Sequence, residues 1–104
     1  MLKVGLSGCN GTMGRILNEL LQEDQHTTVV FGIDLDPTRF ENEYPVFKTP
    51  KEVTVPCDVV IDFSKPENID ALIDYCLLNR VPAVIATTGL TEEQESKIVE
   101  ASHQ

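Results

Sequence analysis

Three evenly spaced glycines follow a short apolar run at the start of the chain. The run Leu2–Leu6 is typical of a buried strand, and Gly8, Gly11 and Gly14 come after it. An amphipathic helix from Met13 to Glu23 is then predicted, with one apolar face made of Met13, Ile16, Leu17, Leu20 and Leu21. In doubly wound proteins a strand, a glycine turn and a helix hold a pyrophosphate. The glycines let the backbone come close, and the helix N-terminus offers free N–H groups.

An acidic residue at the end of the next predicted strand supports the same interpretation. Val29–Ile33 is apolar, and Asp34 ends it twenty positions after Gly14. An acidic residue near that spacing accepts hydrogen bonds from the adenosine ribose hydroxyls in NAD-binding folds. Alternatively, Asp34 only opens a turn with Asp36 and Pro37, and glycine turns follow strands in many folds. Together, however, the two features favour dinucleotide binding.

Strands and helices alternate along the chain, which predicts a parallel sheet with helices on both faces. The expected strands cover residues 2–7, 28–33, 58–62 and 82–86. The expected helices begin at Met13, at Ser64 and at Thr91, the last two with capping boxes. We therefore predict an α/β fold of the doubly wound Rossmann type, with three layers, as a single domain over residues 1–104.

The stretch 35–56 is the least regular part of the sequence, because four prolines interrupt it. It contains a short apolar piece at Val46-Phe47 and one helical turn at Pro50–Val53. We expect it to pack across the sheet edge, beside the adenine end of the site.

Composition and charge restrict the partners of this chain. The formal net charge of −9 over 104 residues argues against nucleic acid and against anionic membrane surfaces. It does not argue against an anionic cofactor, because local N–H groups hold the phosphates. No segment is long enough to span a membrane.

The cysteines and histidines indicate neither a disulfide frame nor a metal site. Cys9, Cys57 and Cys76 show no C-x-x-C spacing, which predicts free thiols in a reducing cytoplasm. His26 and His103 lie far apart, so we expect no metal site. The segment Leu6-Ser7-Gly8-Cys9 also matches a lipoprotein processing box, but the apolar stretch before it is too short for a signal peptide.

Ligands of a doubly wound sheet bind at the carboxyl ends of its strands, so the loops there are candidates. These loops are Gly8–Met13, Asp34, Phe63–Lys65 and Thr87–Gly89. The hydroxyls and the glycine of Thr87–Gly89 favour a cofactor contact. For Ser64 and Thr91, helix capping is the better interpretation. Phe63 either packs in the core or lies against a nicotinamide ring.

Three segments together resemble one family. Gly8–Gly14, Asp62–Glu67 (D-F-S-K-P-E) and Ala86–Gly89 (A-T-T-G) resemble the amino-terminal half of 4-hydroxy-tetrahydrodipicolinate reductase, long called dihydrodipicolinate reductase. The resemblance covers the whole chain in order and spacing. It implies a cytoplasmic, homotetrameric oxidoreductase that uses NADH or NADPH to reduce a cyclic imine. That imine is a precursor of diaminopimelate and lysine in bacteria.

The resemblance also implies a role for each candidate residue. The residues implied to wrap the pyrophosphate are Gly8, Cys9, Asn10, Gly11, Thr12 and Met13. Asp34 would hold the adenosine ribose, and Phe63 would lie near the nicotinamide. Ala86, Thr87 and Thr88 would line the carboxamide side of that ring. No catalytic residue is expected within the chain.

The residue after the acidic position bears on the choice of cofactor. Many family members carry an arginine there, whereas this chain has Leu35, followed by Asp36. A 2′-phosphate would then meet Asp34 without a cation beside it, so we expect a preference for NADH over NADPH. Lys48 or Arg39 folding back toward the ribose would restore NADPH binding.

Length is the main departure from the family. Family members are more than twice as long, and their substrate domain, with its histidine-rich catalytic motif, follows the part that this chain resembles. We therefore expect a cofactor domain that binds dinucleotide without turnover. The sheet would be incomplete at its carboxy-terminal edge, leaving Ala83–Ala86 unpaired, so weak dimerisation or exchange of the last helix between copies is expected.

Two other interpretations stay open. In the first, the chain is a free-standing nucleotide sensor that signals through a partner. In the second, it is part of another Rossmann oxidoreductase, such as a relative of homoserine dehydrogenase. Such a relative shares the glycine turn and the acidic residue, but it does not predict the D-F-S and A-T-T-G segments.

Overall fold

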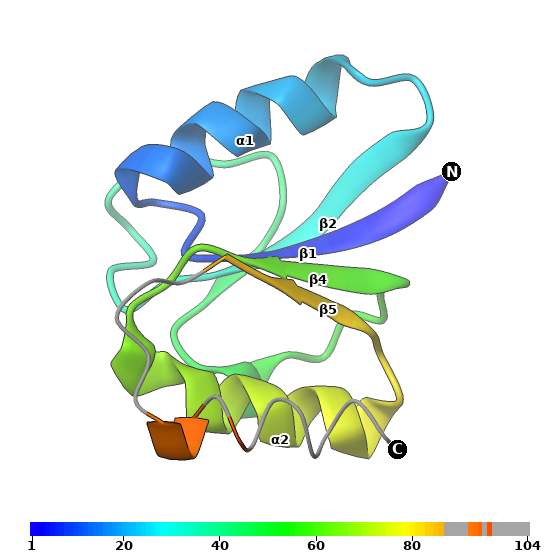
Figure 1. Cartoon of the computed structure of the whole chain (residues 1–104). Coiled ribbons are helices and arrows are strands. Elements are labelled where there is room, and N and C mark those ends of the chain that lie inside the picture. The colour runs from blue at the N-terminus through cyan, green and yellow to red at the C-terminus, as the bar shows by residue number, and fades with distance from the viewer. Residues whose placement is uncertain (87–91, 95, 97–104) are drawn as a thin grey trace.

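The chain forms a parallel sheet flanked by helices (Figure 1). The computed structural model describes residues 1–86, 92–94 and 96. Within them the sheet has the strands β1 (Leu2–Ser7), β2 (Thr27–Ile33), β3 (Val46–Phe47), β4 (Val59–Asp62) and β5 (Ala83–Ile85). The helices are α1 (Thr12–Glu23) and α2 (Ile69–Asn79), and the short 3₁₀ turns are η1 (Pro50–Glu52) and η2 (Pro66–Asn68).

The strand order is β3-β2-β1-β4-β5, and every strand pairing is parallel. The chain therefore runs from β1 outward to β2 and β3, and then crosses back to β4 on the other side of β1. Helix α1 covers one face of the sheet and α2 the other (Figure 1). This is the predicted doubly wound sheet in three layers. The crossing makes the gap between the ends of β1 and β4 the switch point, where such sheets bind ligands.

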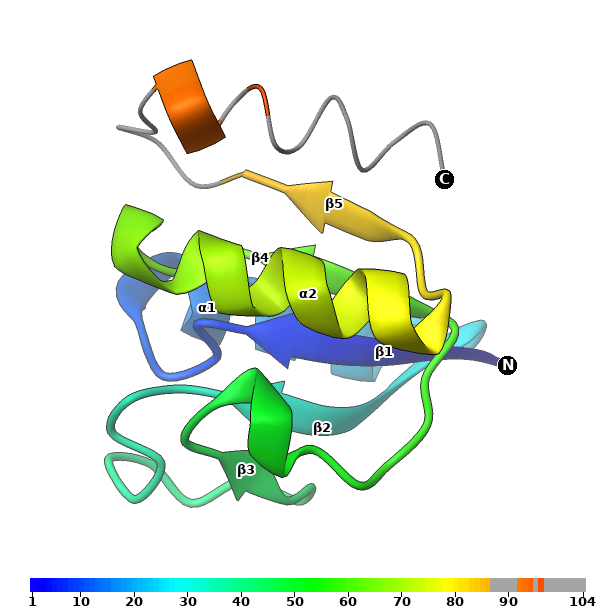
Figure 2. The same cartoon turned by 90° about the horizontal axis from the view of Figure 1, so that it is seen from below.

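The irregular stretch after β2 lies at the sheet edge, as the sequence predicts. β3 pairs with the end of β2, with Gly32 opposite Val46 and Ile33 opposite Phe47. The predicted helical turn is η1, which lies on the same face of the sheet as α2 (Figure 2). Whether this edge lies beside an adenine stays a prediction.

Each face of the sheet has its own buried cluster. On the α2 side Phe31, Val60 and Leu72 are fully buried, and the rings of Phe47 and Tyr75 meet the ring of Phe31 edge to face. On the α1 side the buried cluster is Leu6, Cys9, Val29 and Tyr44, against which Leu17 and Leu21 of α1 pack. The sheet is thus covered by apolar packing on both faces.

The predicted apolar face of α1 is only half correct. Met13, Ile16 and Leu20 are 53%, 50% and 60% exposed, while the buried positions of the helix are Gly14 and Asn18. The buried line is narrower than the apolar stripe, because Gly14 brings the helix against the backbone of the glycine turn. Asn18 then takes the next buried place on the helix.

The other helices also differ in detail from the sequence prediction. A 3₁₀ turn comes first after β4, and α2 begins at Ile69, later than the predicted start at Ser64. Asn68 takes the N-cap position of α2 without a side-chain capping bond. The third helix, predicted from Thr91, lies largely outside the described residues, and residues 92–94 and 96 are helical.

Candidate dinucleotide site

The glycine turn connects β1 to α1 at the carboxyl end of the sheet. Gly8 has a positive φ of 82°, and its N–H donates to the carbonyl of Ile33 at 2.7 Å. The Gly11 N–H donates back to the Gly8 carbonyl at 3.1 Å, and helical bonding starts where the Arg15 N–H meets the Gly11 carbonyl at 2.9 Å. The N–H groups between these two positions open the helix and have no helical acceptor.

The start of α1 favours an anion. Gly11 is the N-cap and provides no side-chain capping bond, and the first turn of the helix holds no acidic residue. The first N–H groups and the positive end of the helix dipole therefore face outward without a carboxylate of the same turn beside them.

The three glycines of the turn are there for different reasons. A Cβ on Gly14 would lie 2.0 Å from the Gly8 carbonyl oxygen, and one on Gly8 would lie 2.8 Å from the backbone of Phe63. Both glycines are therefore required by packing. A Cβ on Gly11 would have only the Gly8 oxygen nearby, at 3.5 Å, which is ordinary contact. Contacts within the described chain therefore do not require a glycine at position 11.

Asp34 follows β2 directly and holds the glycine turn in place. One carboxylate oxygen accepts from the Asn10 N–H at 3.0 Å, and the other accepts from the Asp36 N–H at 2.9 Å. Asp34 thus opens a turn with Asp36 and also contacts the glycine turn. Each carboxylate oxygen has a second lone pair, so these two bonds leave room for ribose hydroxyls as donors.

The side chains of Cys9 and Asn10 are buried. Cys9 belongs to the core under α1, and burial raises the pKa of its thiol to about 12. The Asn10 amide donates to the Asp36 carbonyl at 2.8 Å, and its oxygen accepts from the Asn42 amide at 3.1 Å. Both residues would therefore face a ligand through their backbone. Neither burial is evident from the glycine motif alone.

Two further predicted residues lie at the carboxyl ends of the strands, as the glycine turn does. Phe63 follows β4 and donates its N–H to the Ser7 carbonyl at 2.9 Å, and its backbone packs against Gly8. Ala86 follows β5 and donates its N–H to the Asp62 carbonyl at 2.9 Å. The described candidates therefore gather around the switch point. Thr87 and Thr88 lie outside the described residues.

Two residues near this end of the sheet, Asp62 and Arg15, were assigned no role of their own from the sequence. Asp62 is fully buried at the end of β4, and its carboxylate accepts from the Ser64 N–H at 3.1 Å. An aspartate at a strand end two residues before a serine is a signal for such a turn. Arg15, whose guanidinium lies 4.7 Å from the centre of the Phe40 ring, belongs to this group too. It meets a loop far away in sequence, so no spacing pattern indicates the contact.

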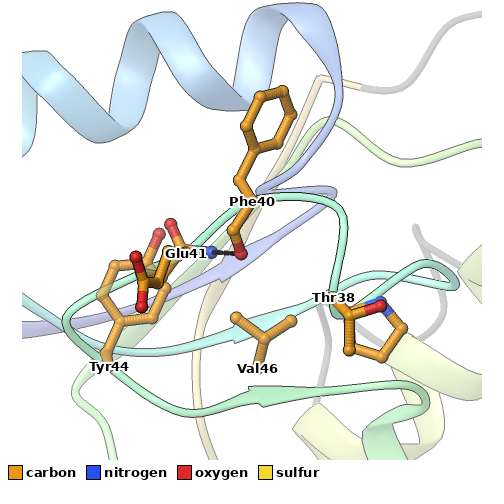
Figure 3. A pocket seen from close by; sticks show the side chains of 7 residues that line it. Thr38, Phe40, Glu41, Tyr44 and Val46 are labelled. Atoms are coloured by element: carbon orange, nitrogen blue, oxygen red, sulfur yellow. Dashed lines mark hydrogen bonds between the residues drawn. The ribbon is translucent and has the colours of Figure 1, made fainter.

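The loop between β2 and β3 encloses a hollow (Figure 3). Phe40 projects from this loop toward α1, while Thr38 and Val46 line the other side. The residues that line the hollow are Pro37, Thr38, Phe40, Glu41, Asn42, Tyr44 and Val46. Tyr44 anchors its base, because its hydroxyl donates to the buried Asn18 amide oxygen at 2.6 Å.

Two properties of the described residues bear on other classes of site. Over the described part of the chain, no helix has both the length and the apolar character needed to cross a bilayer. Among the same residues, no three His, Cys, Asp or Glu side chains gather as metal ligands would. Cys9, Cys57 and Cys76 are free thiols.

Comparison with known proteins identifies the family. The family described as dihydrodipicolinate reductase, N-terminus, matches residues 2–104. The chain belongs to this family. A 4-hydroxy-tetrahydrodipicolinate reductase of Clostridium novyi (strain NT) is 41% identical over 98% of this chain and 40% of its own length. The enzyme of that name from Caldanaerobacter subterraneus subsp. tengcongensis is 40% identical over 100% of this chain and 41% of its own.

Solved structures confirm the Rossmann-type fold. A dipicolinate-bound dihydrodipicolinate reductase from Paenisporosarcina sp. TG-14 superposes with a TM-score of 0.82 at 27% identity, over 98% of this chain and 43% of that one. A myo-inositol 2-dehydrogenase from Lactobacillus plantarum reaches 0.81 at 16% identity, over 98% of this chain and 33% of that one, which shows the fold alone. The chain spans about 40% of the length of the curated reductases it matches.

Proposed function

We propose that residues 1–104 form the nicotinamide-dinucleotide-binding domain of a 4-hydroxy-tetrahydrodipicolinate reductase. The observation that carries this proposal is Gly11, a glycine that folding does not require, at the N-terminus of a helix whose first turn holds no acidic residue. Such a position is useful to a chain that brings a pyrophosphate against its backbone. Membership of the reductase family supports the same function. It also favours this function over a relative of homoserine dehydrogenase.

The proposed contacts follow from where the candidates lie. The backbone from Gly8 to Met13 holds the pyrophosphate, in keeping with the buried side chains of Cys9 and Asn10. Asp34 accepts hydrogen bonds from the adenosine ribose. Their hydrogen bond at 3.0 Å keeps Asp34 and Asn10 together, so the ribose and the pyrophosphate sites are built as one unit.

The nicotinamide end of the cofactor lies across the switch point. Phe63 leaves β4 beside Gly8 and would pack against the ring, while Ala86 leaves the neighbouring strand β5. Thr87 and Thr88 follow Ala86 in sequence and supply hydroxyls to the carboxamide. When bound, the reduced nicotinamide supplies a hydride to the imine carbon of the substrate. The residues of this chain bind and orient the dinucleotide.

Substrate binding and proton donation belong, in this proposal, to the part of the relatives that this chain does not span. The chain alone then binds dinucleotide and shows no turnover, because positioning of the substrate needs groups outside residues 1–104. The proposed parent enzyme is a cytoplasmic homotetramer, and the three free thiols fit a reducing compartment.

For the choice of cofactor we propose a preference for NADH. Leu35 follows Asp34, and Asp36 adds a second carboxylate to the same turn. The guanidinium of Arg39 lies over the Phe40 ring, with its centre 5.4 Å from the ring centre. Calorimetric titration with NADH and with NADPH at two salt concentrations measures the ratio of affinities. Tighter binding of NADPH at low salt contradicts the preference.

Self-association is proposed at the edge of β5. In the described sheet β5 is the outermost strand on its side, and Val84 is 57% exposed. Exposed strand edges pair with other chains, so we propose weak dimerisation at high concentration. Sedimentation that stays monomeric at every concentration contradicts it.

Position 11 offers a direct test of dinucleotide binding. The backbone of Gly11, with φ −80° and ψ 173°, suits any residue, and serine is a better N-cap than glycine. We therefore expect Gly11→Ser to keep or raise the melting temperature. The side chain would occupy the space needed by the pyrophosphate, so NADH affinity should fall at least about tenfold.

Two further variants complete this test. Asp34→Ala should also weaken NADH binding, but through the ribose. Asn79→Ala serves as a control, because the Asn79 amide only meets the Tyr75 carbonyl in the last turn of α2. Equal NADH affinity in Gly11→Ser and the wild type, measured by calorimetry, would contradict a pyrophosphate at this turn.

A further inference from the structure

Asn42 lies at a junction of three segments that are far apart in sequence. Its amide nitrogen donates to the Asn10 side-chain oxygen at 3.1 Å and to the Phe40 carbonyl at 3.4 Å. Its amide oxygen accepts from the guanidinium of Arg15. One side chain therefore joins the glycine turn, the first turns of α1 and the loop between β2 and β3.

The loop between β2 and β3 binds both the nitrogen and the oxygen of the Asn10 side-chain amide. The Asn10 amide donates to the Asp36 carbonyl at 2.8 Å, while its oxygen accepts from Asn42. The Asn10 N–H is bound in turn by Asp34 at 3.0 Å. Two of these bonds hold the Asn10 side chain, and the third holds the peptide group that precedes Asn10. This peptide group precedes the N–H groups that the turn offers to a phosphate.

Arg15 extends the same arrangement to the helix. Its guanidinium meets Asn42 and the Phe40 ring, both in the loop, and it also lies within hydrogen-bonding reach of Tyr44. The described contacts of this cation are thus with an amide, a hydroxyl and a ring near the start of α1. The loop, the turn and the helix start are held in one fixed relation.

We propose that Asn42 is a positioning residue of the dinucleotide site. It holds the glycine turn through Asn10 and the start of α1 through Arg15, so that the backbone N–H groups stand in the binding geometry before the ligand arrives. Preorganisation of this kind raises affinity because less order has to be created on binding. The proposal rests on the proposed function of the turn, and it adds a residue that does not itself touch the ligand.

The position of Asn42 separates this role from a general structural one. Asn42 lies in a loop of mostly exposed residues, and neither buried apolar cluster includes it. Removing its side chain should therefore change the turn without changing the core. This difference is visible in amide hydrogen exchange, which reports on each backbone N–H separately.

The experiment compares Asn42→Ala, Asn42→Asp and the control Asn79→Ala in the whole chain. NADH and ADP-ribose affinities are measured by calorimetry, melting by circular dichroism, and amide exchange by NMR. We expect Asn42→Ala to weaken both ligands about tenfold, with faster exchange confined to residues 8–15 and a melting temperature within a few degrees. Asn42→Asp keeps an acceptor for Arg15 and loses the donor to Asn10, so it should show a smaller loss in the same residues.

The outcomes divide clearly. NADH affinity within twofold of the wild type in Asn42→Ala overturns the proposal. Faster exchange across the whole sheet with a lower melting temperature also overturns it, because Asn42 would then be a general structural residue. If Asn42→Ala does not fold, Asn42→Asp decides between the same results. If the wild type binds neither NADH nor NADPH, the proposed function fails, and the exchange data alone decide whether Asn42 orders the turn.

Discussion

The two faces of the sheet are held by different kinds of contact. On the α2 face the rings of Phe47 and Tyr75 meet the ring of Phe31 edge to face, and Leu72 is buried in the same apolar cluster. On the α1 face, Gly14 brings the helix against the backbone of the glycine turn. The helix also buries the polar Asn18, while Leu17 and Leu21 pack against the apolar cluster of that face. Both faces carry an apolar cluster, but the α1 face adds a close backbone contact at a glycine and a buried polar side chain.

In our proposal, this difference separates the contacts that stabilise the domain from those that hold the ligand. Apolar burial is non-directional and is the dominant favourable contribution to folding. A ligand held by backbone N–H groups needs a fixed geometry, which hydrogen bonds and close glycine contacts provide. We therefore expect mutations on the α2 face to change stability alone, and mutations around the turn to change affinity as well.

The largest expected effect on stability is on the α2 face. Leu72 is fully buried, and Leu72→Ala should lower the free energy of unfolding by about 2–5 kcal/mol. The affinity for NADH of the folded fraction should stay within about twofold, since Leu72 lies on the other side of the sheet from α1. Urea unfolding and calorimetry measure the two quantities. Leu78→Ala on the same helix, where the residue is 85% exposed, is the control and should change stability by less than about 0.5 kcal/mol.

A smaller loss of stability with a larger loss of affinity is expected on the α1 face. In Gly14→Ala the new methyl group meets the Gly8 carbonyl, so α1 must move away from the turn. Overpacking of this kind costs about 1–3 kcal/mol. NADH binding should be lost in the same variant because the helix start is displaced. A variant with wild-type stability and affinity would show that the close approach of α1 is dispensable.

Alkaline pH should lower the free energy of unfolding through buried thiols on both faces of the sheet. Burial raises the pKa of the Cys9 thiol to about 12 and that of Cys76 to about 11, so the folded state keeps protons that the unfolded chain loses from about pH 9. The stabilisation is complete below that pH and is lost as pH rises toward the folded values, by at most about 1.4 kcal/mol per pH unit for each thiol. The urea concentration at the midpoint of unfolding should decrease as the pH is raised from 8 to 10.5.

Replacing each thiol by alanine measures how much that thiol contributes to the loss of stability at alkaline pH. Cys9→Ala and Cys76→Ala should each flatten the pH dependence, because burial raises the pKa of both thiols. If the urea midpoint of the wild type does not change between pH 8 and pH 10.5, the destabilisation predicted from the buried thiols is wrong.

The smallest expected effect is a gain in stability from a substitution at the end of α2. Arg80 adopts a left-handed conformation with φ 56° and ψ 44°, which favours glycine. Arg80→Gly should raise the free energy of unfolding by about 0.5–1 kcal/mol and leave NADH affinity unchanged. Thermal melting measures this gain, and Arg80→Ala should show none. A lower melting temperature for Arg80→Gly would mean that the arginine side chain contributes more than its backbone costs.

Local sequence patterns predict the sheet well. The apolar runs at β1, β2, β4 and β5 have the length and residue types of buried parallel strands, and even the two-residue β3 stands out as an apolar pair between prolines. Their alternation with helices fixes the fold class, since parallel neighbours need a crossover between them. Even so, the apolar pattern of α1 does not say which part of the stripe is buried, because Gly14 decides how close the helix lies.

The candidate site is predictable only where it is local. The glycine turn, Asp34 and Phe63 follow strand ends directly, and the topology brings strand ends together. The contact between Arg15 and Asn42 joins residues 27 positions apart, and it depends on how the loop between β2 and β3 folds back. No periodicity or motif encodes such a contact, so only the structure shows it.

Gly11 has a consequence for anyone who would redesign this chain for robustness. A stability-guided redesign sees a glycine in an unstrained conformation with open space around it and replaces it with a better N-cap. The resulting protein would express and melt as well as its parent or better, and in our proposal it would have lost its ligand. A thermostability screen therefore selects against function at this position, and such a redesign should keep Gly11 unchanged.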